Sequence, residues 1–267
     1  MDGNNKYSDF EIAKPLMVEI TTSEKEELTN KFVKNDEGIY ENIKNSDIKE
    51  ATLLCAGQIQ YDQPLGDRAK LGNQYDFLPN FELMKKCFAT GDLVIGNLTA
   101  MASSNYLSTE MIKSEYLYNQ QYSNARPEYI EALKHAGFDC LAMAAPGNLD
   151  TGVSGIADSE DCLHRNGILP VVIGQEKAKI FHINDLKIGI LSYAVRCDNV
   201  DKMITPEGAE KILNIYSKEK AEKDIEILRN QGADFILAYL NCGNEKSAIK
   251  IDVREGLGME IAEAGAD

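Results

Sequence analysis

The sequence is poor in the residues and motifs from which most catalytic sites are built. It has three histidines, His135, His164 and His182, and none of its six cysteines forms a C-x-x-C pair. Without that pair the usual spacing of zinc and dithiol redox sites is missing, so we expect reduced cysteines rather than a disulfide framework. The patterns G-x-G-x-x-G, G-x-x-x-x-G-K and G-x-S-x-G are also absent. Their absence argues against the common nucleotide-binding loops and the serine nucleophile elbow.

Long apolar runs and basic side chains are scarce as well. No stretch of about 18 apolar residues occurs, so we expect no membrane span. Residues 1–6 form no apolar signal segment, so the chain as written is expected to be cytoplasmic, and envelope-associated if an anchor was removed. The formal net charge of −15 and the pI of about 4.7 argue against nucleic acid or an anionic membrane as the main partner.

What the chain does contain is a set of short apolar runs separated by helical patterns. Its 267 residues are 43% hydrophobic, enough for a sizeable core. Strands that are apolar throughout and alternate with helices indicate an α/β fold covered on both faces. We expect the apolar strands that end at Gly57, Asn97, Ala145 and Leu240 to lie side by side, with their carboxyl ends at one edge. A hairpin around Asn184-Asp185 suggests a second, partly antiparallel sheet. The expected strands are 51–57, 92–98, 140–145, 169–173, 178–183, 186–195 and 234–240, and the expected helices are 77–89, 126–138, 156–166, 206–231 and 255–264.

Residues 1–50 differ from the rest of the chain because they are polar and charged, with weak helical periodicity. A capped helix start at residues 22–28 favours a helical segment, and the composition also suits partial disorder. We therefore predict an N-terminal extension over 1–50, helical or partly disordered, followed by an α/β domain over 51–267.

The chain is organised around residues 126–166. A helix with Pro127 in its first turn and Gly137 at its end leads into the apolar run Cys140–Ala145. Pro146-Gly147-Asn148 then breaks that strand before the next helix. In open α/β sheets, ligands bind at the carboxyl ends of strands, so this loop is the candidate site.

Residues 136–152, AGFDCLAMAAPGNLDTG, resemble the bacterial capsule-synthesis CapA family, calcineurin-like proteins linked to poly-γ-glutamate capsules. Members typically have aGFDvvslANNHalDyG at this place. The resemblance extends over about residues 51–267, and it implies a calcineurin-like β-sandwich flanked by helices. It also implies a metal site of the metallophosphoesterase type.

The residues that carry chemistry in the family are replaced in this chain. The family's Gly-Asp is Gly57-Gln58, and its Asn-Leu-Glu is Asn97-Leu98-Thr99. The chain also stops at Asp267, before the family's closing Gly-His-His-Pro-His, so we expect the domain to be C-terminally incomplete. The remaining replacements are Ala145-Pro146-Gly147 for Asn-Asn-His and Asn241-Cys242-Gly243-Asn244-Glu245 for His-Trp-Gly-x-Glu.

A site of this type needs carboxylates and imidazoles that converge on metal ions. Because the replacements are neutral, we expect no metal, no cofactor and no catalytic residue. The prediction is a pseudoenzyme that acts as a binding or assembly module in capsule or cell-envelope polymer metabolism, with a protein or envelope polymer as its partner. Its vestigial cleft would comprise Gly57, Gln58, Asn97, Thr99, Ala145, Pro146, Gly147, Asn148, Asp150, Asn241, Cys242 and Glu245.

Several alternatives remain open at this point. A metal-dependent hydrolase or transferase could rebuild its ligands from Asp62, Asp150 and Glu245. Asn148 could replace the missing ligand, but Pro-Gly-Asn-Leu-Asp also fits a simple turn, which we favour. Cys242 is either a nucleophile or, as we favour, a buried thiol in the space of the family's Trp.

The other cysteines and histidines invite plainer interpretations. Cys55 and Cys140 lie in apolar strand patterns and are expected to be buried small hydrophobes. Cys162 and His164 are close enough in sequence to suggest a ligand pair, but a core thiol beside a surface imidazole is the stronger interpretation. A last alternative is that the chain is a fragment whose missing part carries the chemistry.

Overall fold

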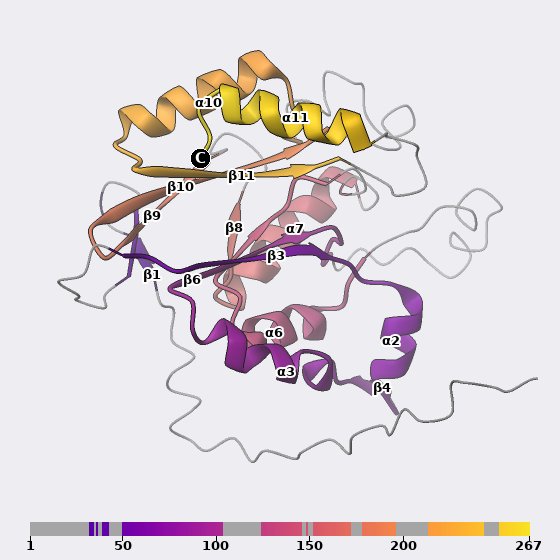
Figure 1. The fold of residues 1–267 in the computed structure, drawn as a ribbon. Coiled ribbons are helices and arrows are strands. Elements are labelled where there is room, and N and C mark those ends of the chain that lie inside the picture. Colours follow the sequence, from indigo (N-terminus) through magenta and orange to yellow (C-terminus); the bar gives the residue numbers. More distant parts are fainter. Residues whose placement is uncertain are drawn as a thin grey trace, which may run out of the picture.

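Two β-sheets pack face to face, and helices cover the outer face of each, which gives four layers (Figure 1). Three apolar clusters separate these layers. One fills the space between the sheets, and one lies under the helices on either side. The computed structural model describes residues 32–34, 36, 39–42, 50–103, 124–145, 148, 152–171, 178–195, 213–242 and 251–267.

The first sheet has four parallel strands in the order β3-β6-β7-β8. Every residue of its central strand β6 is buried, as expected for a parallel strand covered on both faces. Because the strands are parallel, their carboxyl ends meet at one edge. The strands are β3 (Leu53–Ile59), β6 (Leu93–Leu98), β7 (Cys140–Ala142) and β8 (Leu169–Val171).

The second sheet has the order β1-β2-β9-β10-β11, with β10 and β11 parallel. The turn between β9 and β10 is formed by Asn184 and Asp185, whose φ angles of 49° and 63° suit a two-residue hairpin. A small separate hairpin joins β4 (Lys70–Leu71) to β5 (Gln74–Tyr75). The strands of the second sheet are β1 (Phe32–Lys34), β2 (Tyr40–Asn42), β9 (Ala178–Ile183), β10 (Leu186–Ala194) and β11 (Phe235–Asn241).

Tyr239 of β11 joins the two sheets. Its hydroxyl donates to the backbone oxygens of Ala56 in β3 and Ile95 in β6, both at 3.1 Å. Burial is the main cause that raises the pKa of Tyr239 well above its usual range, so the hydroxyl remains a donor. The carboxyl ends of β3, β10 and β11 point to the same side of the sandwich (Figure 1).

The helices begin and end at recognisable signals. Ser217 caps α10 by accepting from the Lys220 amide, and Asp62 caps α2 by accepting from the Leu65 amide. Gly137 closes α6 with φ 112°, a conformation that glycine adopts without strain. Helices α3, α6 and α7 cover the first sheet and α10 and α11 the second. Their bounds are α2 (Gln63–Ala69), α3 (Leu78–Phe88), α6 (Pro127–Ala136), α7 (Gly152–Arg165), α10 (Lys218–Asn230) and α11 (Ile251–Glu263).

The α/β prediction and the sandwich flanked by helices are confirmed, and three details were wrong. β11 lies in the second sheet, not beside β3, β6 and β7. Of the helix predicted over 206–231, residues 206–212 lie outside the described residues, 213–217 are not helical because Ile215 bridges to Ala194, and α10 begins at Lys218. Cys55 is exposed, because β3 is an edge strand and not a central one.

The predicted extension over 1–50 is described only in part. Within it, residues 32–34 and 40–42 are the strands β1 and β2, which join the second sheet instead of forming a helix. The boundary at residue 50 stays a prediction. Among the described helices, none combines the length and apolar content needed to cross a bilayer.

Candidate functional site

The candidate site lies where β6, β7, β10 and β11 end. Asn97, the penultimate residue of β6, pairs with Gln58 of β3 on one side and Ala142 of β7 on the other. Ser192 of β10 reaches across from the second sheet, and its hydroxyl accepts from the Ala144 amide at 3.3 Å. The ends of both sheets therefore contribute side chains to one region.

On the first sheet, Gln58 and Thr99 stand where the family resemblance implies ligands, and both side chains make local hydrogen bonds. Gln58 follows a register shift in β3, and its exposed side chain accepts from Gln60 at 3.4 Å. The Thr99 hydroxyl donates to the backbone oxygen of Ile59 at 3.1 Å, which fixes the end of β3 against β6. Both hydrogen bonds hold the local chain and leave no anionic group at either position.

Asn148 lies in the turn that follows β7. Its amide donates to the backbone oxygen of Ala145 at 3.1 Å, so the predicted turn is confirmed for this residue. The side chain is fully buried, and neither its Oδ1 nor its Nδ2 has a hydrogen-bond partner among the described residues.

Two further buried amides come from the second sheet. Asn214 donates through Nδ2 to the backbone oxygen of Ser192 at 2.7 Å and accepts the Ala194 amide on its own backbone oxygen. Asn241 ends β11, is buried, and accepts the Val195 amide on its backbone oxygen. Cys242 follows it and is half-buried, and its Sγ lies 3.8 Å from the backbone oxygen of Leu240.

Three side chains of this region carry polar atoms that are buried and unpaired within the described chain: Asn97 Oδ1, Asn148 Oδ1 and Nδ2, and Asn214 Oδ1. A buried polar group without a partner costs about 1–3 kcal/mol, so such groups are rare unless a function retains them. We name the set Asn97, Asn148, Ser192, Asn214 and Asn241 the amide cluster.

The amide cluster does not fit the metal that the family resemblance implies. Its side chains are neutral amides and one hydroxyl, whereas a hydrolytic metal site is built mainly from carboxylates and imidazoles. Across the described ranges, no group of three or more His, Cys, Asp or Glu side chains is placed to hold a metal ion. The cluster can donate hydrogen bonds to a neutral amide or hydroxyl group of a ligand, and it can accept hydrogen bonds from such a group.

The remaining candidates of the sequence lie elsewhere or are not described. His135, on α6, contacts Glu82 at 3.4 Å, and His182, next to the end of β9, contacts Glu41 at 3.7 Å. His164 lies on α7, where Cys162 is buried. Asp62 is engaged as the cap of α2. Pro146, Gly147, Asp150 and Glu245 lie outside the described residues.

Sequence reasoning missed Ser192 and Asn214. Both come from segments without a motif, and Asn214 falls in a stretch that was expected to be helical. The available signal was a polar residue, Ser192, inside the otherwise apolar stretch 188–194 of β10. Such a residue in a buried strand needs a partner, which here is the Ala144 amide of the other sheet.

Residues 52–267 match the family described as bacterial capsule synthesis protein PGA_cap. The chain belongs to this family. The resemblance seen in residues 136–152 is thereby confirmed, over nearly the same range as expected. No curated protein matches the chain.

Replacing Asn148 by leucine, which has a similar branched shape, should stabilise the fold. The substitution removes two unpaired buried polar atoms, and we expect the free energy of unfolding to rise by about 1 kcal/mol. Asn124 is the matched control, because it is also buried but exchanges two hydrogen bonds with the Ser103 backbone. Asn124→Leu should lower that free energy by about 2 kcal/mol. Urea titration of both variants gives the comparison, and destabilisation by both would mean that Asn148 is satisfied in solution.

Proposed function

We propose that this member of the capsule synthesis family is non-hydrolytic and serves as a binding or assembly module for a capsule or cell-envelope polymer. The observation that carries the proposal is the amide cluster, with its unpaired polar atoms, at the strand ends where the family resemblance implies charged ligands. Neutral amides cannot activate water as a metal-bound carboxylate site does. They can recognise another amide by hydrogen bonding.

The polymer that the resemblance implies, poly-γ-glutamate, offers backbone amides as well as carboxylates. The net charge of −15 on this chain repels a polyanion at low ionic strength, so recognition would rest on the amides. Salt should therefore strengthen the binding of poly-γ-glutamate, in contrast to a site that binds it through cations. A protein partner in the same envelope machinery remains the other candidate ligand.

The test uses fluorescently labelled poly-γ-glutamate at about 0.15 M and 0.5 M NaCl, chosen to span strong and weak screening, with Mn²⁺, Zn²⁺ or Mg²⁺ added in separate samples. We expect retention on the protein, a polymer length that does not change, and weaker retention for Asn148→Leu. Asn124→Leu is the control for damage to the fold. Shortening of the polymer with any of the metals would favour the hydrolase alternative, and loss of that activity in Asp150→Ala or Glu245→Ala would establish rebuilt ligands. Absence of retention would contradict the polymer-binding role.

A further inference from the structure

The large apolar side chains that the described chain exposes are concentrated on its two outer helical layers. Six of the seven lie on these helices or on the hairpin that leads into one of them, and the seventh is Phe235 at the start of β11. The six are Leu71, Leu78, Leu83 and Met84 on β4 and α3, and Ile227 and Met259 on α10 and α11. Single exposed apolar residues are normal on a protein surface, whereas concentration on two layers points to contacts that bury them.

The first concentration, on α3, is bordered by basic side chains. Leu83 is 92% exposed, and Lys86, one helical turn later, lies on the same side of the helix. Residues 68–88 contain four basic and two acidic residues, although the whole chain carries a formal charge of −15. One of the two acidic side chains, Glu82, contacts His135 of α6 at 3.4 Å. We call Leu83 and Lys86 the basic face.

The second concentration, on α11, is bordered by acidic side chains. Met259 is 66% exposed, and Glu255 and Glu263, four residues before and after it, lie on the same side of the helix. Ile227 of α10 is 52% exposed and adds a second apolar side chain to this layer. Glu263 also contacts Lys218 at 3.7 Å, so the charge test below uses Glu255. We call Glu255, Met259 and Glu263 the acidic face.

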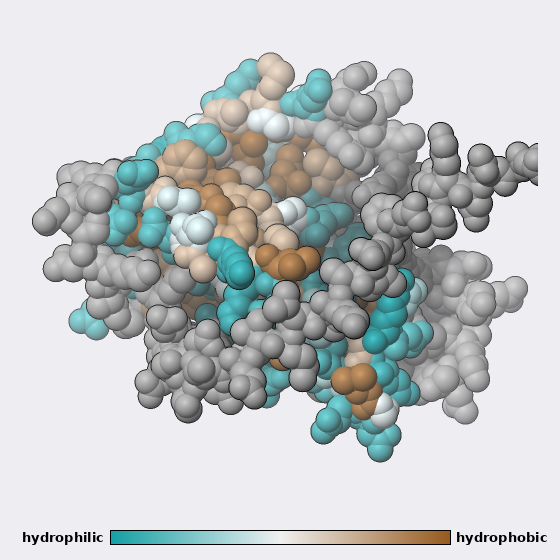
Figure 2. Space-filling view, turned by 60° about the horizontal axis from the view of Figure 1, so that its bottom comes forward, coloured by the Kyte–Doolittle hydropathy of each residue, from teal (hydrophilic) through white to brown (hydrophobic). Residues whose placement is uncertain are grey.

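The two faces lie on opposite sides of the molecule. α3 covers the outer surface of the first sheet and α11 that of the second, so both sheets lie between them (Figure 1). Figure 2 is turned toward the side on which α3 lies and shows apolar side chains bordered by hydrophilic ones. One copy therefore cannot bring its own two faces together, but the basic face of one copy can meet the acidic face of the next.

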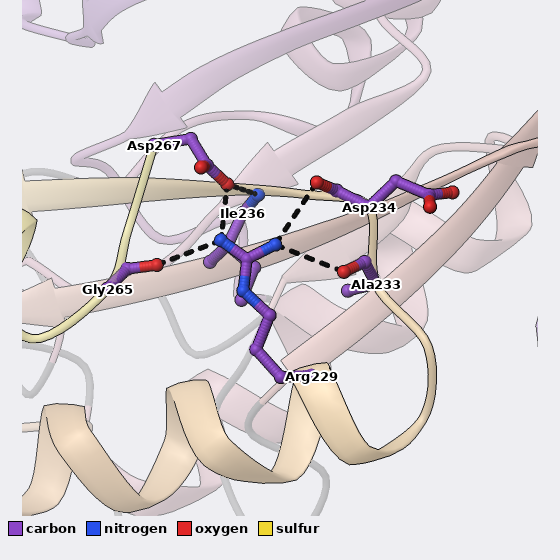
Figure 3. Close-up of polar contacts among 6 residues, drawn as sticks. All are labelled: Arg229, Ala233, Asp234, Ile236, Gly265 and Asp267. Carbon is purple, nitrogen blue, oxygen red and sulfur yellow. Dashed lines mark hydrogen bonds and ion pairs between the residues drawn. The ribbon is translucent and has the colours of Figure 1, made fainter.

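The acidic face is fixed on the second sheet by Arg229 at the end of α10. Its guanidinium donates to the Asp267 carboxylate at 2.6 Å and to the Gly265 oxygen at 3.0 Å, both just after α11. The same guanidinium donates to the backbone at the start of β11, and the Asp267 carboxylate accepts the Ile236 amide at 2.8 Å (Figure 3). These contacts hold α10 and α11 in place against β11.

The basic face is fixed on the first sheet by aromatic packing. Phe88 of α3 packs against Phe138, with ring centroids 4.8 Å apart, and Phe81 of α3 packs against Tyr129 of α6 at 5.5 Å. Both faces are therefore formed before any contact, and a contact between them requires little ordering of the chain.

We propose that the basic face of one copy docks on the acidic face of the next, so that this chain assembles head to tail. Leu83 and Met259 form the apolar centre of the contact, and Lys86 and Glu255 attract each other across it. Because the two faces lie on opposite sides, the contact is heterologous and does not close at a dimer. The faces are separate from the amide cluster, so self-assembly is a function beyond the proposed polymer site.

The test uses two variants of the full chain, each of which blocks one face. Leu83→Asp and Met259→Asp place a carboxylate at the centre of the contact, where it would lose its hydration. Both side chains are exposed, so the fold should tolerate each change, which circular dichroism checks. Sedimentation velocity of the parent, of each variant and of their equimolar mixture covers about 10 µM to 1 mM, so that dissociation constants as weak as about 1 mM are visible.

We expect the average mass of the parent to rise with concentration beyond that of a dimer, and each variant to stay monomeric. The equimolar mixture should form a species of twice the monomer mass and no larger one, because the Leu83→Asp copy keeps its acidic face and the Met259→Asp copy its basic face. A monomeric parent or a monomeric mixture would overturn the proposal. Dimers of Met259→Asp alone would also overturn it, since they would show a symmetric contact between two basic faces.

Charge reversal checks the pairing of the faces independently. Lys86→Glu should weaken the association by up to about fivefold, because like charges then meet at the margin of the contact. Adding Glu255→Lys to the same chain should restore part of the loss, since each copy then presents the reversed charge on both faces. Equal association of the parent, the single variant and the double variant would contradict the pairing.

Discussion

Tyr129→Ala is expected to lower the free energy of unfolding by about 3–5 kcal/mol, as for other large buried aromatic side chains. Tyr129 of α6 is buried at the centre of an aromatic cluster, with ring centroids 5.4 Å from Tyr61 and Phe77 and 5.5 Å from Phe81. Its hydroxyl donates to the backbone oxygen of Gln60 at 2.9 Å, and burial raises its pKa well above the usual range. The residue thus holds α3, α6 and the chain after β3 together.

Tyr129→Phe separates the two contributions of this residue. It keeps the ring contacts and removes only the hydrogen bond, so the free energy of unfolding should fall by about 1 kcal/mol. Urea unfolding monitored by far-ultraviolet circular dichroism gives both values. Similar losses in the two variants would show that the hydroxyl, and not the aromatic packing, fixes α6 on the sheet.

The second large effect is expected for Asp139→Ala. This substitution should lower the free energy of unfolding by about 2–3 kcal/mol, because a charged, buried hydrogen bond to the Val94 amide disappears. The Asp139 carboxylate is buried, so water cannot replace it at the start of β7. Asp234 is the matched control, since it makes the same pair with Lys187 but is exposed. Asp234→Ala should cost about 1 kcal/mol or less, because water can take the place of the lost acceptor.

The measurement is again the free energy of unfolding, with Asp139→Asn as a third variant that keeps an acceptor. We expect Asp139→Asn to recover part of the stability lost in Asp139→Ala. Equal losses at Asp139 and Asp234 would contradict the account, because burial would then have no influence on the strength of this pair.

Much of the architecture was predictable from local signals. The apolar runs of β6 and β7, Pro127 and Gly137 around α6, and Asn184-Asp185 in the hairpin each act within a few residues. The position of a strand within a sheet is not a local property. An apolar run such as 51–57 therefore suggested a central strand with a buried Cys55, whereas β3 lies at an edge.

For the candidate site, too, the residues with a local sequence signal were predictable and those placed by long-range packing were not. Asn97, Ala145 and Asn241 could be named from the family frame, because they lie at or next to the ends of apolar strands. Ser192 and Asn214 could not, because only the packing of one sheet on the other brings them to the same region. The cap of α2 was missed although its signal is local: Asp62 was considered as a metal ligand, and Pro64 in the first turn indicates a helix start.

The central claim, that the site has exchanged charged ligands for neutral amides, is tested most directly by metal content. Protein purified without chelator is dialysed against Mn²⁺ and Zn²⁺, freed of excess ion by gel filtration and analysed by elemental mass spectrometry. The account predicts much less than one ion per chain, and the same value for Asp150→Ala and Glu245→Ala. About one tightly held ion per chain, lost in either variant, would contradict it.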